Sequence, residues 1–500
     1  MLAAISKAGG KMKKIGLIQS VSALAIGAIL LAGIGCTKGA GKISVTTSSE
    51  EARQAYLEGQ VLLDNVGVTG ARPFFETAVA ADPNFALAYL RLAFTQTNPS
   101  DFRAQVQKAS ALADSVSEGE RLWIQSVEAA NQGNPAKALE LLQQLVTAYP
   151  NDERAHFLLA GNYFIAQHNL AKAIEKYEKA VAINPEFAAA YNLLGYANRN
   201  SGNTAEAEQA FKKYIELLPN NPNPYDSYAE FLLNTGRYDA SIDSYQKALS
   251  VDPHFVASYI GIATNLNFQG KHKEARGQIQ EMFRTARTDG ERRLAYLATV
   301  TSYVDEGQLD KAVEELGKRY ALAEKNGSAI QMAADLNIMG NLLLEAGEVR
   351  EAQAKYKQAW TLSEESDIPD AAKAAAQRAR YANAARVALK KSDVAAAKSA
   401  TEEFRTLAES ANIPGQTRLY HLLSGTIALE EKVYDRALEE LQQANQQNPR
   451  TPFRMALAYQ GQGDSENAKL LCERIEGLNQ LNSINYSLVR HKAQQLLDSI

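Results

Sequence analysis

The chain has 500 residues, 46% of them hydrophobic, and its 53 basic and 57 acidic residues leave a formal net charge of −4. This composition is typical of a folded protein, and the nearly neutral balance gives no indication of nucleic-acid binding. A chain of this length would usually form about three domains. In an array of repeats, however, the length reflects the number of repeats and not the number of domains.

The first 36 residues differ from the rest of the chain. Four lysines precede an uncharged, mostly apolar run over residues 15–35, which ends at Cys36 and is followed by a small, polar stretch to Ser49. This order predicts an export signal at 1–35, starting at Met1 or Met12. Because the run ends at a cysteine preceded by Gly35, it resembles a bacterial lipoprotein signal. The resemblance implies cleavage before Cys36 and lipid attachment to it, although Gly33 stands where that family prefers leucine.

Two alternatives remain open for this segment. The run is long enough to span a bilayer uncleaved, with Lys13 and Lys14 on the cytoplasmic side, and it also fits an ordinary secretory signal cut beyond Cys36. All three readings place the remaining residues outside the cytoplasm. We expect a lipid anchor facing the periplasm or the outside of a bacterial envelope, or else an N-terminal transmembrane anchor, followed by a flexible linker over 36–50.

The middle of the chain repeats itself every 34 residues. Pro185, Pro219 and Pro253 share this spacing, and the same residue types return between them at the same offsets. In one interval the recurring residues are Tyr191, Leu194, Gly195, Gly202, Ala207, Phe211 and Pro219. Large residues at helical spacing predict a buried stripe, and small ones let two helix axes approach closely. Each interval is therefore predicted to contain two short helices joined by a turn at the Gly202 position.

This unit resembles the tetratricopeptide repeat in both length and residue types. The resemblance implies an all-α, right-handed superhelical solenoid of about twelve helix-turn-helix repeats, because one unit cannot bury its own apolar face and must stack. We expect an N-terminal array over 51–287, most regular at 154–255, and a C-terminal array over 288–483. A capping helix over 484–500 is expected to cover the last apolar face.

The spacing loosens after Pro253. Turn residues are predicted at Gly307, Gly347, Ser392, Lys432 and Gly463, with steps of 31 to 45 residues, and the longer steps predict longer helices. Cys472 lies among leucine and isoleucine residues, which favours a small core residue over a reactive thiol. A basic cluster in this region is flanked by acids and is interpreted as a balanced helix surface; it comprises Lys373, Arg378, Arg380, Arg386, Lys390, Lys391 and Lys398.

The family resemblance also implies a candidate groove, because the first helix of each tetratricopeptide unit lines a concave face. Asparagine side chains both donate and accept hydrogen bonds, which suits an extended peptide, although solvated helix faces would also explain them. The positions that match are Asn162, Asn192, Tyr196, Arg199, Asn200, Asn223, Asp226, Glu230, Asn234 and Asn267.

Catalytic and metal-binding patterns are not found in the sequence. The six histidines are dispersed over different units, and no His-Glu-x-x-His, Cys-x-x-Cys or Gly-x-Ser-x-Gly motif occurs. We therefore expect no enzyme activity, cofactor, metal, nucleic acid or small-molecule substrate. The predicted function is a membrane-anchored interaction scaffold that binds proteins or peptides; a fixed structural or regulatory subunit of a membrane complex is the alternative, and an enzyme the least supported one.

Overall fold

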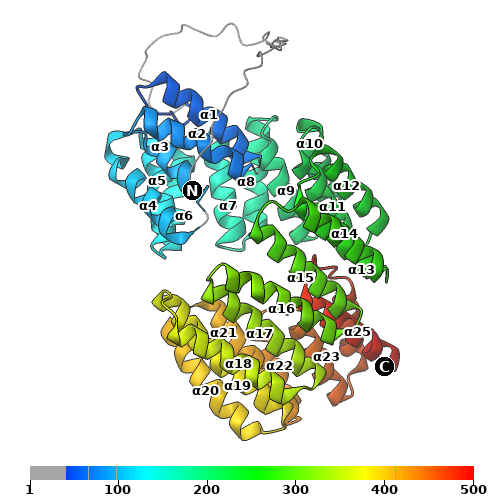
Figure 1. Ribbon diagram of the computed structural model, residues 1–500. Helices are drawn as coiled ribbons and strands as arrows, with labels where there is room; N and C mark the ends of the chain where they lie inside the picture. The colour runs from blue at the N-terminus through cyan, green and yellow to red at the C-terminus, as the bar shows by residue number, and fades with distance from the viewer. Residues whose placement is uncertain (1–40, 66, 97, 412) are drawn as a thin grey trace, which may run out of the picture. The chain divides into compact units, whose positions relative to one another are not determined.

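The computed structural model describes residues 41–500 except 66, 97 and 412, and these residues form one unit. It contains 25 α-helices and one short 3-10 helix, and over the described residues it has no β-strand (Figure 1). The predicted signal, including Cys36, lies outside the described residues. Over the part that is described, no helix is both long and apolar enough to cross a bilayer.

The helices occupy most of the described chain. In the first half they are α1 (Glu50–Asp64), α2 (Val68–Ala81), α3 (Ala86–Ala93), α4 (Pro99–Ala111), α5 (Glu118–Asn131), α6 (Pro135–Ala148), α7 (Glu153–Ile165), α8 (Leu170–Ile183), α9 (Ala188–Ser201), α10 (Thr204–Leu217), α11 (Pro222–Asn234) and α12 (Tyr238–Val251). In the second half they are α13 (Val256–Phe268), α14 (His272–Thr285), α15 (Asp289–Asp305), α16 (Leu309–Lys325), α17 (Ala329–Ala346), α18 (Val349–Glu365), α19 (Asp370–Lys390), α20 (Val394–Ala411), α21 (Pro414–Glu430), α22 (Tyr434–Gln443), α23 (Arg450–Gln462), α24 (Ser465–Glu476) and α25 (Ile484–Ser499).

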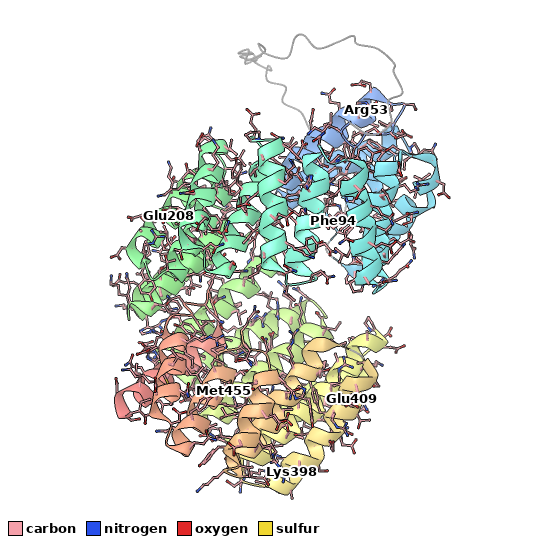
Figure 2. The ribbon with its side chains drawn as sticks, turned by 180° about the vertical axis from the view of Figure 1, so that it is seen from behind. Arg53, Phe94, Glu208, Lys398, Glu409 and Met455 are labelled. Carbon is pink, nitrogen blue, oxygen red and sulfur yellow. The ribbon has the colours of Figure 1, made fainter. Side chains whose placement is uncertain are left out.

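Each odd helix packs antiparallel to the even helix that follows it, so α1 to α24 form twelve pairs and α25 is left over. The predicted solenoid of about twelve helix pairs with a final capping helix is confirmed. Consecutive odd helices also contact one another, as α7, α9, α11 and α13 do. The odd helices therefore form the inner layer, and even helices such as α20, with exposed Lys398 and Glu409, form the outer one (Figure 2).

The predicted turn residues adopt the left-handed backbone conformation that ends a helix tightly. Among the glycines at these turns, φ is 84° at Gly202 and 90° at Gly347. Ser392 and Lys432 take φ values of 58° and 59° without being glycines. The predicted lengthening is also confirmed, because α7 to α14 have 13 or 14 residues whereas α19 has 21.

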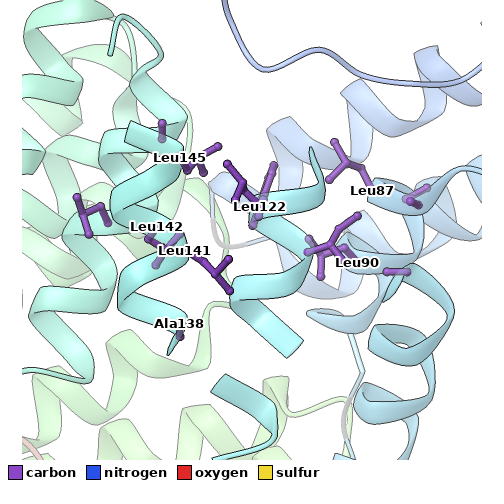
Figure 3. Packing of buried hydrophobic residues seen from close by; sticks show 14 of the residues in the cluster. Leu87, Leu90, Leu122, Ala138, Leu141, Leu142 and Leu145 are labelled. Atoms are coloured by element: carbon purple, nitrogen blue, oxygen red, sulfur yellow. The ribbon is translucent and has the colours of Figure 1, made fainter. Parts of the chain in front are cut away.

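In several pairs the core joins a small residue on the odd helix to a large one sixteen positions later. Gly195 faces the fully buried ring of Phe211 in this way, and Gly340 faces Tyr356 although their unit is longer. In the N-terminal units, leucines replace part of this aromatic core: Figure 3 shows Leu87 and Leu90 of α3 near Leu122 of α5. Cys472 is fully buried, as expected of a core residue, and burial raises the pKa of its thiol to about 11.

The residues just before α1 differ from the expected flexible linker. Residues 41–49 are non-helical but bound: the Ile43 N–H donates to Asp152 at 2.8 Å, and the Thr46 N–H donates to Glu120 at 2.7 Å. Both carboxylates lie at helix N-termini, where free N–H groups favour negative charge. Linker composition alone did not indicate these acceptors, because they lie more than 70 residues away in sequence.

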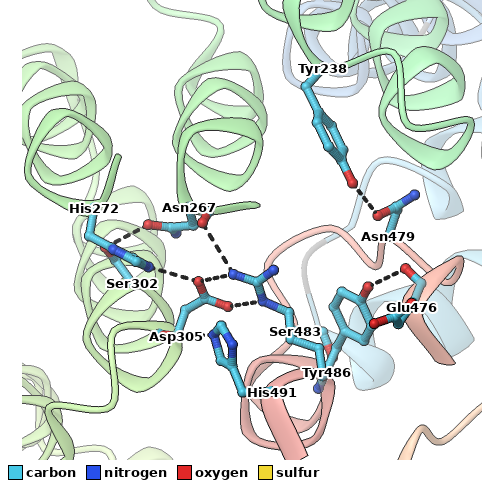
Figure 4. Close-up of polar contacts among 11 residues, drawn as sticks. Tyr238, Asn267, His272, Ser302, Asp305, Glu476, Asn479, Ser483, Tyr486 and His491 are labelled. Atoms are coloured by element: carbon cyan, nitrogen blue, oxygen red, sulfur yellow. Dashed lines mark hydrogen bonds and ion pairs between the residues drawn. The ribbon is translucent and has the colours of Figure 1, made fainter. Parts of the chain in front are cut away.

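The C-terminal helix does more than cover the last pair. It packs against α24 and α23 and also returns to α15, 185 residues earlier, where the Arg490 guanidinium holds the fully buried carboxylate of Asp305 through two hydrogen bonds of 2.6 and 2.7 Å. His272 and His491 contact the same aspartate, through its carboxylate and its backbone oxygen respectively (Figure 4). The C-terminal helix α25 is therefore bound to α15, in the middle of the chain.

Candidate partner-binding face

The inner face of α9, α11 and α13 is set by the repeat length. Residues about 34 positions apart occupy the same place on successive odd helices, so they become lateral neighbours once the units stack. Tyr196 and Glu230 are 34 positions apart and meet at 3.1 Å, and Asp226 and Ser258 are 32 apart and meet at 2.7 Å. The sequence period therefore determines which polar groups meet on this face.

Five side chains form a polar row across the three helices: Tyr196 and Arg199 on α9, Asp226 and Glu230 on α11, and Ser258 on α13. The Tyr196 hydroxyl and the Arg199 guanidinium donate to the two carboxylate oxygens of Glu230, at 3.1 and 2.7 Å. The guanidinium also lies 4.8 Å from the centre of the Tyr196 ring. Because Arg199 and Glu230 keep 21% and 24% of their side-chain surface exposed, a partner can reach the pair.

Burial controls the charge of the row. It raises the pKa of Asp226 to about 7; the Ser258 hydrogen bond lowers that pKa, and the Glu230 charge raises it. The pKa of Tyr196 is raised, mainly by burial and then by Glu230. The raised pKa favours the protonated form of Asp226, and the ion pair of the row is the one between Arg199 and Glu230.

Two asparagine oxygens beside the row accept no hydrogen bond from the residues the structure describes. They are Oδ1 of Asn162 on α7 and Oδ1 of Asn192 on α9, and Asn192 is only 8% exposed. The hydroxyl of Tyr245, on the outer helix α12, also lacks a partner among these residues. Buried acceptors are normally satisfied, so these two oxygens would accept a backbone N–H of a partner only after their side chains turn toward the open face.

The other predicted groove residues have different surroundings. Asn200 is exposed and accepts a hydrogen bond from Arg199 Nε at 3.2 Å, whereas Asn223 is buried and donates to the Tyr214 hydroxyl at 2.9 Å within the core. Asn223 therefore supports packing between units.

Asn234 and Asn267 face the returning C-terminal segment. Asn234 donates to the backbone oxygen of Asn479 at 3.0 Å, and the buried Asn267 accepts from Ser302 at 2.8 Å, as Figure 4 shows for the latter pair. The inner face that α25 leaves uncovered therefore ends near α13. Sequence reasoning missed Ser258, which its 32-residue offset from Asp226 could have identified, and it also missed Asn479, for which the sequence carries no comparable signal.

The described residues hold no group of three or more His, Cys, Asp and Glu side chains that could bind a metal ion. The polar row offers hydrogen-bond donors, acceptors and one ion pair, which are suited to binding.

Comparison with known families identifies the central units. Models described as "Tetratricopeptide repeat" match residues 125–161, 158–222 and 223–255. Tetratricopeptide repeats are therefore confirmed over 125–255, which includes α9 and α11 of the polar row and ends just before α13.

Curated relatives match only part of this chain and part of their own length. The peroxisomal targeting signal receptor of Kluyveromyces lactis is 28% identical over 229 residues, which are 44% of this chain and 40% of the receptor. A tetratricopeptide repeat and J domain-containing co-chaperone of Cryptococcus neoformans is 26% identical over 150 residues, 30% of this chain and 28% of the co-chaperone. The cytochrome c-type biogenesis protein CycH of Rhizobium meliloti is 29% identical over 136 residues, 27% of this chain and 35% of CycH.

Solved structures are similar at low identity. The Cut9–Hcn1 hetero-tetramer of APC/C matches over 85% of this chain and 76% of the other, with 17% identity and a TM-score of 0.39. A MamA structure matches over 33% of this chain and 88% of the other, with 24% identity and a TM-score of 0.27.

Proposed function

We propose that this protein is a membrane-anchored interaction scaffold of the bacterial cell envelope, and that it binds a protein or peptide partner on the inner face of α7, α9, α11 and α13. The observation that carries the proposal is the polar row, which contains the half-buried ion pair of Arg199 and Glu230. The unsatisfied oxygens of Asn162 and Asn192 lie beside it. An extended peptide would supply acceptors to the accessible Arg199, and N–H donors to these oxygens once their side chains turn outward.

The relatives support binding as the general activity. A targeting signal receptor, a co-chaperone and a cytochrome biogenesis protein share the repeat-bearing region. The chain spans less than half the length of these relatives, so a particular partner cannot be transferred from them.

Photocrosslinking in cells tests the binding face. A crosslinking amino acid at Asn200, which is exposed beside Arg199, is expected to capture a defined partner, whereas one at Glu216, exposed on the outer helix α10, is not. Asn192, Tyr196 and Arg199 changed together to alanine should abolish capture from position 200. A control with Lys212 and Lys213, both on the outer helix α10, changed to alanine should retain it. Equal capture by both variants would exclude this face.

The anchor is tested separately. If Cys36 carries lipid, labelled palmitate is incorporated into the wild-type chain and not into Cys36→Ser. Equal labelling of the two would reject lipidation and favour one of the other export signals.

A further inference from the structure

The inner layer of the C-terminal half borders a partly open cavity of about 550 Å³. Five consecutive odd helices line it, α17, α19, α21, α23 and the returning α25. Its size lies in the range of small-molecule sites, which are mostly apolar with a few placed polar groups. Much of the lining is aliphatic, including Leu344, Leu389, Leu419, Leu422, Leu457 and Leu488.

The charges in the lining do not balance. Five basic side chains, Arg386, Lys390, Arg450, Arg454 and Lys492, face two acidic ones, Glu345 and Glu430. Glu345 is already shared, because Arg450 Nη1 donates to it at 2.6 Å and Lys492 Nζ at 2.8 Å. These bonds give Glu345 a pKa of about 2, although burial opposes the shift.

Arg386 on α19 and Arg454 on α23 are left without an acidic partner among the described residues, although both are half-buried. Arg386 Nη1 donates to the Asn383 side chain at 2.9 Å, and Arg454 Nη1 donates to the Arg450 backbone oxygen at 3.2 Å. Each guanidinium has five N–H donors, so most remain available to a ligand.

The two groups also repel each other and Arg450. Burial, followed by the charge of Arg450, lowers the pKa of Arg454 to about 10, and Arg386 contributes to the same shift. Arg386 itself has a lowered pKa, with burial again the largest cause. Partly desolvated positive charge of this kind is costly unless an anion compensates it.

We propose that this cavity binds a small amphiphile with an anionic head group, held by Arg386 and Arg454, and an apolar body packed among the leucines. A carboxylate or a phosphate would satisfy the paired guanidiniums, and the aliphatic lining matches an acyl chain rather than a polar metabolite. The site is distinct from the polar row, since it uses other helices and takes a small molecule.

The test uses the purified full chain and three probes: anilinonaphthalene sulfonate, which has an anion and an apolar body; N-phenylnaphthylamine, which has the same body without the anion; and inorganic pyrophosphate. Saturable binding of the sulfonate is expected, with at least tenfold weaker binding of the amine and no displacement by pyrophosphate. Decanoate or decyl phosphate should displace the sulfonate. The stronger competitor of the two identifies the preferred head group, carboxylate or phosphate. Displacement by decanol as strong as that by the anions would overturn the proposal.

Variants locate the binding. Arg386→Gln with Arg454→Gln should weaken sulfonate binding at least tenfold, whereas Arg405→Gln with Arg436→Gln, on the outer helices α20 and α22 and outside the cavity lining, should not. Thr426→Phe fills the cavity and keeps its charges, so it should abolish binding of both dyes. This variant tests whether the cavity is the binding site if the double arginine variant does not fold. Unchanged affinity in Thr426→Phe would place the dye elsewhere and reject the cavity as the site.

Discussion

Replacing Gly195 by alanine tests how tightly the helix pairs are packed, and the chain supplies a matched control in Gly161. Both glycines are in odd helices, one repeat apart, and alanine in a helix interior is about 0.8–1.0 kcal/mol better than glycine. A Cβ at Gly161 would meet only the Tyr177 hydroxyl, at 3.7 Å, an ordinary contact. Gly161→Ala is therefore expected to stabilise the protein by up to about 1 kcal/mol.

At Gly195 the added carbon would lie 2.7, 2.8 and 2.9 Å from three atoms of the Phe211 ring. That ring is fully buried, with Tyr196 at 5.2 Å and Phe231 at 5.6 Å between ring centres, so it has little room to move. Overpacking costs about 1–3 kcal/mol, which cancels or outweighs the propensity gain. Gly195→Ala is thus expected to be about 1–3 kcal/mol less stable than Gly161→Ala.

The assay is urea unfolding followed by circular dichroism, with both variants measured against wild type. Phe211→Leu, which removes ring atoms from the contact, should cost less in the Gly195→Ala background than in wild type. If Gly195→Ala proves as stable as Gly161→Ala, the close approach of α9 and α10 is not a constraint and the packing argument fails.

Two further predictions concern buried charge. The raised pKa of Asp226, about 7 against 3.8, means that the folded state holds this proton more tightly than the unfolded chain does. Its contribution to stability is complete below pH 3.8 and is lost by about pH 7, at most about 4 kcal/mol. Asp226→Asn should flatten this part of the stability–pH curve, while the exposed control Asp243→Asn should not; parallel curves for wild type and Asp226→Asn would refute the assignment. Arg490→Met leaves the Asp305 carboxylate buried without its guanidinium, at a cost of about 3 kcal/mol, and should expose α25 to limited proteolysis. Adding Asp305→Asn should restore part of the loss, and unchanged protease resistance in Arg490→Met would show that the ion pair does not hold α25.

Most of the fold could be predicted because its determinants are local. The turn at Gly202, the contact of Gly195 with Phe211 and the extra length of α19 all follow from residues within one or two units. Even the turns at Ser392 and Lys432 were located by periodicity, although their residue types do not indicate positive φ.

Contacts between distant units could not be predicted in this way. Asn234 and Asn479 are 245 residues apart, and no period relates α11 to the segment before α25. The same holds for the bond between Ile43 and Asp152, which changes a segment of linker composition into a bound one. Such pairings depend on the total rotation of the solenoid over many units. That rotation is the sum of small rotations between neighbouring repeats, so no single repeat determines it.

The basic cluster around Arg386 shows why this matters for function. In the regular units the 34-residue period places Arg199 of one odd helix beside Glu230 of the next, 31 positions later, so charges on the inner face neutralise each other. In the C-terminal half the helices lengthen and the step between units changes, so lateral partners no longer fall at a fixed offset.

Asn337 there meets Asn383, 46 positions later, and Glu345 meets Arg450, 105 positions later. Among the described residues, neither Arg386 nor Arg454 forms an ion pair with an acid, and the balanced surface expected from flanking acids is wrong for Arg386, whose side chain lines the cavity. The irregularity that makes the C-terminal repeats hard to recognise is thus also what leaves their inner face positively charged.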